Sequence, residues 1–134
     1  MKTKTGLIFV FIMFIVLGCS KDDQVLSFCS DVEGMSKDIV AAVDGNSDKS
    51  AGVDAALKIL NEKGPAIKNS YTEMQDIRGF QVSEETVAKM TETVTSSVTN
   101  VMKLKLTLVT ATMKDEALSK KVDELMDGYQ GLFM

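Results

Sequence analysis

The chain has 134 residues, 45% of them hydrophobic, which is enough for one domain around one hydrophobic core. It contains no histidine, which excludes Ser-His-Asp triads, Cys-His pairs and histidine-based metal or haem sites. Acidic residues outnumber basic ones by 19 to 15, a balance that opposes binding to nucleic acid. We therefore expect a non-enzymatic protein without a metal or cofactor.

The start of the chain has the layout of a secretion signal. Lys2 and Lys4 form a short basic segment, and residues 6–17 (GLIFVFIMFIVL) follow without a charged side chain. A membrane-spanning helix needs roughly 20 apolar residues, and this run is shorter. Residues 1–18 are thus predicted to be a signal peptide.

The sequence Val16-Leu17-Gly18-Cys19 resembles the lipobox of bacterial lipoproteins. This resemblance covers residues 1 to about 23. It implies cleavage between Gly18 and Cys19, attachment of lipid to the Cys19 thiol, and anchoring in a bacterial envelope membrane. Two or three acyl chains make such an anchor durable, because each buried methylene contributes about 0.8 kcal/mol. The alternative is a plain signal anchor or an inner-membrane stub with an incidental cysteine.

The residues after Cys19 bear on sorting. Ser20 stands where an aspartate favours retention in the inner membrane of enteric bacteria, so the resemblance implies the outer membrane. Lys21-Asp22-Asp23 is similar to the export signal of surface lipoproteins in some bacteria, but a solvated tether would have the same composition. The periplasmic face and the cell surface both remain open.

Loss of the signal leaves 116 residues with 13 basic and 19 acidic side chains, a net charge of −6. Cys29 is then the only free thiol, so no disulfide can form within the monomer. Cys29 lies beside an apolar stripe with helical spacing, which favours its burial. The stripe consists of Val25, Phe28, Val32, Met35, Ile39 and Val43. We divide the chain into a signal peptide (1–18), a lipid-anchored tether (19–24) and a helical domain (25–134).

Two helices are predicted in the first half of this domain. The first runs from about Gln24 to Asp44 and ends at Gly45, a residue free to adopt positive φ. The second is capped by Ser47 or Ser50 and keeps its apolar spacing across Gly64-Pro65, which indicates one kinked helix.

Two more helices are predicted in the second half. Ser83 caps the third, which reaches about Thr112, although residues 101–110 also have strand-like alternation. Helical projection favours a helix buried on most sides. The fourth begins near Thr112 or Asp115. Its apolar stripe consists of Leu118, Val122, Leu125, Tyr129 and Leu132. The expected fold is an all-α antiparallel bundle of about four helices.

Two features of the bundle are candidates for binding. Asp44-Gly45-Asn46-Ser47-Asp48 matches three positions of an EF-hand loop, but Lys49 and Ala55 stand where glycine and the bidentate glutamate are needed, so an interhelical turn is favoured. Lys105 projects near the middle of the apolar arc of the third helix. It either reaches to the edge of that arc, or pairs with an acid across the bundle or on a ligand.

Two functions fit these features. The first is a lipid-anchored interaction or adaptor module that docks on an envelope protein, as the small helical lipoproteins called pilotins do for secretion pores; the likeness is one of size, anchor and helix content. The second is a carrier that holds an apolar ligand or lipid within the bundle. The sequence does not identify the partner or ligand.

Overall fold

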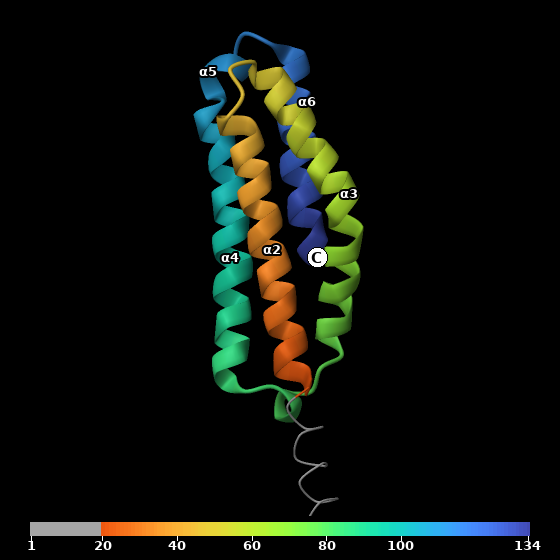
Figure 1. Ribbon diagram of the computed structural model, residues 1–134. Coiled ribbons are helices and arrows are strands. Elements are labelled where there is room, and N and C mark those ends of the chain that lie inside the picture. Colours follow the sequence, from red (N-terminus) through yellow and green to blue (C-terminus); the bar gives the residue numbers. More distant parts are fainter. Residues whose placement is uncertain (1–19) are drawn as a thin grey trace, which may run out of the picture.

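The structure, a computed structural model, describes residues 20–134, which form a four-helix bundle without strands. Its helices are α2 (Ser20–Asp44), α3 (Lys49–Gln75), α4 (Glu84–Thr107), α5 (Val109–Thr112) and α6 (Glu116–Gln130), with short 3-10 turns η1 (Gly79–Gln81) and η2 (Gly131–Phe133). The predicted all-α antiparallel bundle is confirmed (Figure 1). The predicted signal peptide and Cys19 lie outside the described residues.

Helix α2 begins at Ser20 rather than near Gln24, so residues 20–24, assigned above to a tether, lie in its first turns. Asp22 and Asp23 favour this early start, because acidic side chains interact well with the positive end of a helix dipole. Gly45 follows the helix as predicted, but the expected positive φ is absent, since no described glycine adopts one. The reason for a glycine here is steric. A Cβ at Gly45 would lie 2.8 Å from the carbonyl oxygen of Ala41.

Helix α3 is a single helix that contains Pro65, as predicted, and Figure 1 shows that it changes direction near its middle. Gly64 is buried there, and a Cβ at this position would lie 3.3 Å from the Leu132 side chain. The N-cap is Asp48 rather than Ser47 or Ser50: its carboxylate accepts hydrogen bonds from the backbone N–H groups of Ser50 and Ala51.

Helix α4 begins as predicted, with the Ser83 hydroxyl accepting the N–H of Thr86. The helical interpretation of residues 101–110 is confirmed, with one irregularity: α4 ends at Thr107, Leu108 forms a turn, and α5 adds one further turn of helix. Asp115 caps α6 by accepting the N–H of Leu118.

Helix α2 packs against α3 and α4, and α6 packs against the same two helices from the opposite side. With a rise of 1.5 Å per residue, α2 is about 37 Å long and α6 only about 22 Å. Figure 1 shows that α6 covers one half of the bundle and ends near its middle. We call the end with Ser20 and the α3–α4 connection the proximal end, and the end with α5 and the α2–α3 turn the distal end.

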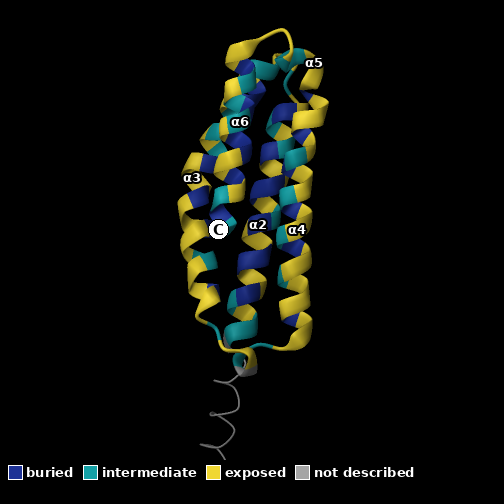
Figure 2. Cartoon of the chain, turned by 180° about the vertical axis from the view of Figure 1, so that it is seen from behind, coloured by how far each residue is buried: buried dark blue, intermediate teal, exposed yellow. Residues whose placement is uncertain are grey.

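The core follows one stripe along each helix, seen as the dark inner faces in Figure 2. The predicted stripes of the first and last helices are confirmed, since all of their members are buried: Val25, Phe28, Val32, Met35, Ile39 and Val43 on α2, and Leu118, Val122, Leu125, Tyr129 and Leu132 at the C-terminal end. The cores at the two ends differ, because α6 supplies a fourth wall only at the distal end. None of the described helices is long and apolar enough to cross a membrane.

Candidate interaction surface

Three exposed apolar side chains gather at the distal end. Leu106 is 75% exposed, Met113 82% and Val109 48%, and the three lie within eight consecutive residues. We call Leu106, Val109 and Met113 the distal patch. Three large exposed apolar side chains so close together make this segment a candidate interaction surface.

The spacing of these three side chains keeps them close together. They are separated by three and four residues, the spacing of neighbours on a helix. Helical hydrogen bonds are present on both sides of the turn at Leu108: the N–H of Leu108 bonds to the carbonyl oxygen of Leu104, and the N–H of Met113 to that of Val109, at 2.9 and 3.0 Å. The patch is therefore held on helical backbone.

The opposite face of the same segment anchors it to the core. Val101, Leu104 and Leu108 are at most 3% exposed. The prediction that this helix is buried on most sides is wrong, because no described helix covers the face of Leu106. The alternation of apolar residues that suggested a strand is explained by two separate apolar faces, one in the core and one in solvent.

Lys105 flanks the distal patch and does not lie in a buried arc. Its ammonium group is 2.7 Å from the Asp123 carboxylate of α6, and both side chains are at least half exposed. The Lys105 side chain thus reaches the surface and pairs there with an acid of a neighbouring helix. The hydrogen bond to Asp123 and its negative charge raise the pKa of Lys105 above its ordinary value. This pair holds α4 to α6 beside the patch.

Basic side chains stand at both ends of the distal patch, and at its C-terminal end the acidic Asp115 and Glu116 follow. Lys103 and Lys114 are exposed, and no acidic side chain among residues 20–134 forms an ion pair with either. Lys105 is the third cation here, but Asp123 neutralises it. The surface thus combines an apolar centre with two free positive charges at its rim.

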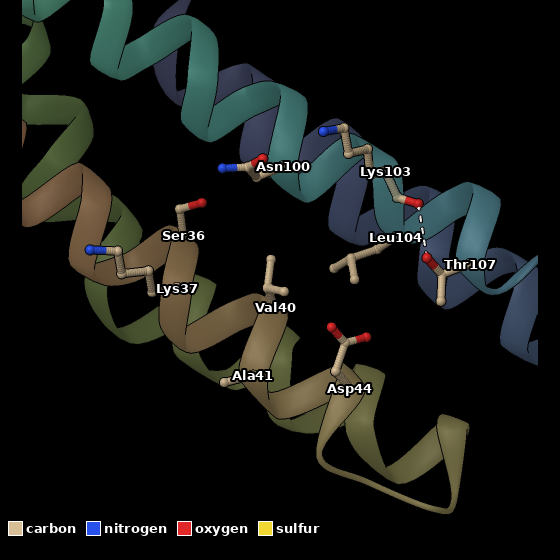
Figure 3. A pocket seen from close by; sticks show the side chains of 9 residues that line it. All are labelled: Ser36, Lys37, Val40, Ala41, Asp44, Asn100, Lys103, Leu104 and Thr107. Atoms are coloured by element: carbon tan, nitrogen blue, oxygen red, sulfur yellow. Dashed lines mark hydrogen bonds between the residues drawn. The ribbon is translucent and has the colours of Figure 1, made fainter.

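A groove between α2 and α4 is the second candidate, with a volume of about 450 Å³. Figure 3 shows Val40 and Leu104 directed into the space between the helices, while the ammonium groups of Lys37 and Lys103 point away from it. The hydroxyl of Thr107 donates its hydrogen bond to the carbonyl oxygen of Lys103, so it does not donate one to a ligand in the groove. The groove is open to solvent along one side, so it offers no enclosed space for an apolar ligand.

Two reactive groups lie in the core. Cys29 is only 2% exposed, and burial raises the pKa of its thiol, so it is a weak nucleophile. Tyr129 is fully buried, and its hydroxyl has no hydrogen-bond partner among the described residues. Burial raises the pKa of Tyr129, and the nearby Ser36 and Ser97 side chains partly offset that rise. Neither group is reached from the surface.

The segment that partly matches an EF-hand is an interhelical turn. Asp48 directs its carboxylate to the start of α3, and Lys49 bonds to the carbonyl oxygens of Val43 and Asn46 at 3.1 and 2.9 Å. The Lys49 ammonium group therefore places a positive charge within this turn, which opposes binding of a cation. Within residues 20–134 no three Cys, Asp or Glu side chains are grouped closely enough to hold a metal ion.

Sequence reasoning found Lys105 but missed the distal patch, which begins at the next residue. No protein-family model, curated protein or solved structure matches the chain.

Proposed function

We propose that the protein is a lipid-anchored component of a bacterial envelope, and that it acts as a non-enzymatic interaction module. The lipobox-like sequence ending at Cys19 supports the anchor, with the outer membrane as its location. The exposed Leu106, Val109 and Met113 carry the interaction function. Their position at the distal end puts the patch about 37 Å, the length of α2, from the residue next to the anchor.

The partner in this proposal is an envelope protein with an apolar groove and acidic residues at its margin. Anchors at intervals of three and four residues are those of a helix that binds in a groove. Lys103 and Lys114 complement acidic margins, since neither is neutralised by a described residue. Complete burial of a large apolar side chain contributes about 1.5–3 kcal/mol, so the patch supplies several kcal/mol toward binding.

Lipid or apolar-ligand transport is the less supported function. It requires an enclosed apolar space, and the groove of Figure 3 is open and partly polar. The buried stripes of the helices fill the interior with their own side chains.

Photo-cross-linking in cells tests the proposal. A photoreactive residue replaces Leu106 in the full-length protein, and a control chain carries it at Thr95 on the exposed face of α4. Intact-mass measurement of the mature chain reports the lipid on Cys19. We expect acylated Cys19 and one envelope protein cross-linked from position 106 but not from position 95. Equal cross-linking from both positions contradicts the interaction surface, and an unmodified Cys19 contradicts the anchor.

A further inference from the structure

The proximal end has an apolar rim of its own, formed by Leu26, Ile77, Val82 and Val87. Leu26 is 45% and Val87 50% exposed, and Ile77 and Val82 are partly buried. The last three line a groove of about 210 Å³ between α3, α4 and their connection. We propose that this proximal rim rests in the headgroup region of a phospholipid bilayer, so that the bundle stands end-on with its distal patch directed away from the membrane. This inference depends on the proposed lipid anchor at Cys19.

The start of α2 fixes how far the rim can lie from the membrane. The helix begins at Ser20, one peptide bond after Cys19, so no extended tether separates the lipid from the bundle. Leu26 lies about 9 Å along the axis from Ser20. The headgroup region of one leaflet is roughly 5–8 Å deep. A bundle attached at Cys19 therefore brings its first turn to the depth of the headgroups and places Leu26 at their outer edge.

A direct contact keeps the rest of the rim at the same depth. Asp22, three residues after Cys19, accepts the backbone N–H of Ser83 at 2.9 Å, and the Ser83 hydroxyl lies 3.3 Å from the same oxygen. This contact joins the first turn of α2 to the start of α4, one turn before Val87. The α3–α4 connection, with Ile77 and Val82, is thereby held beside the anchor site.

The charges at this end specify the kind of lipid. Three basic side chains (Lys21, Arg78 and Lys89) are outnumbered by six acidic ones (Asp22, Asp23, Glu73, Asp76, Glu84 and Glu85). Anionic lipids attract basic segments and repel acidic ones. The matching surface is a zwitterionic bilayer, in which apolar side chains enter the interface without charge repulsion.

Because the chain has no tryptophan, an introduced indole reports one position only. The Val87→Trp variant carries it on the rim, and the Leu106→Trp variant places it at the distal end as a control. Each variant is produced from the full-length chain, and the intact mass of its mature, acylated form is measured. This form is then reconstituted into phosphatidylcholine vesicles that contain lipid brominated near the headgroup. We expect blue-shifted emission and strong quenching for Val87→Trp, and neither for Leu106→Trp.

The outcomes separate the two proposals. If both variants are acylated and the tryptophan fluorescence of neither is quenched, the end-on orientation is overturned and the anchor stands. An intact mass without acyl chains overturns the anchor, and with it the orientation. Replacing part of the phosphatidylcholine by phosphatidylglycerol is expected to weaken the quenching of Val87→Trp, and stronger quenching overturns the preference for zwitterionic lipid.

Discussion

Asp22 and Ser83 are 61 residues apart, and the backbone N–H of Ser83 donates a 2.9 Å hydrogen bond to the Asp22 carboxylate. The bond links the first turn of α2 to the residue that caps α4. Asp22 belongs to the Lys21-Asp22-Asp23 segment. From the sequence, this segment is either an export signal or a solvated tether. In the structure the same carboxylate contributes to the fold.

This bond makes stability depend on pH. The hydrogen bond from Ser83 lowers the pKa of Asp22 below its ordinary value of 3.8, so the stabilisation is present above that value and is lost as pH falls through the lower pKa of the folded state. We expect Asp22→Asn to lower the melting temperature at neutral pH, and the loss to disappear in strong acid. The control is Asp23→Asn, in the same helical turn. Equal melting temperatures for the two variants at neutral pH contradict the role of Asp22.

Truncation of Leu106 and of Leu108 tests in solution whether this segment is a helix or a strand. Leu108 is 1% exposed and Leu106 75% exposed, whereas residues two apart in a strand share one face. We expect Leu108→Ala to cost about 2–5 kcal/mol of unfolding free energy, as core truncations do. Leu106→Ala should stay within about 0.5 kcal/mol of the parent. Denaturant titration measures both, and similar losses at the two positions would support the strand.

The Lys105–Asp123 pair should behave as a surface ion pair. Because the pKa of Lys105 is raised, its stabilisation is complete below the ordinary value of 10.5 and is lost as pH rises through the pKa of the folded state. A double-mutant cycle with Lys105→Met and Asp123→Asn is expected to give a small favourable coupling that high salt reduces. A coupling that salt leaves unchanged would contradict an exposed pair.

The thiol of Cys29 should be unreactive in the folded protein. It is 2% exposed, and its raised pKa keeps it protonated at neutral pH. With Cys19 acylated, a thiol reagent is expected to label the native chain only as fast as it unfolds. Rapid stoichiometric labelling of native protein would show that α2 opens away from α4.

The sequence predicts where the helices of this protein lie better than it predicts which of their faces other helices cover. Helical spacing predicted the buried stripes of α2 and α6, because a helix that packs in a bundle must bury its apolar face. The cap of α3 was missed since Ser47, Asp48 and Ser50 are all good N-cap residues, and local chemistry alone does not choose among them.

The candidate surface was harder to predict, for a related reason. Projection of the third helix places Leu106 and Leu108 on different faces, but it does not say which face another helix covers. That depends on where α6 packs, and α6 covers one side of α4 only. Projection placed Lys105 in a buried arc because it could not show that this part of the helix is uncovered. In the structure Lys105 pairs with Asp123 at the surface.

The central claim is that the distal patch binds a protein partner, and affinity recovery after cross-linking tests it most directly. The Leu106→Ser/Met113→Ser variant removes the two most exposed apolar side chains of the patch, and Met134→Ser, 77% exposed, is the matched control. We expect the patch variant to remain folded and lipidated but to recover at least about tenfold less partner, since about 1.4 kcal/mol corresponds to a factor of ten. Undiminished recovery of that partner by the patch variant would contradict the claim.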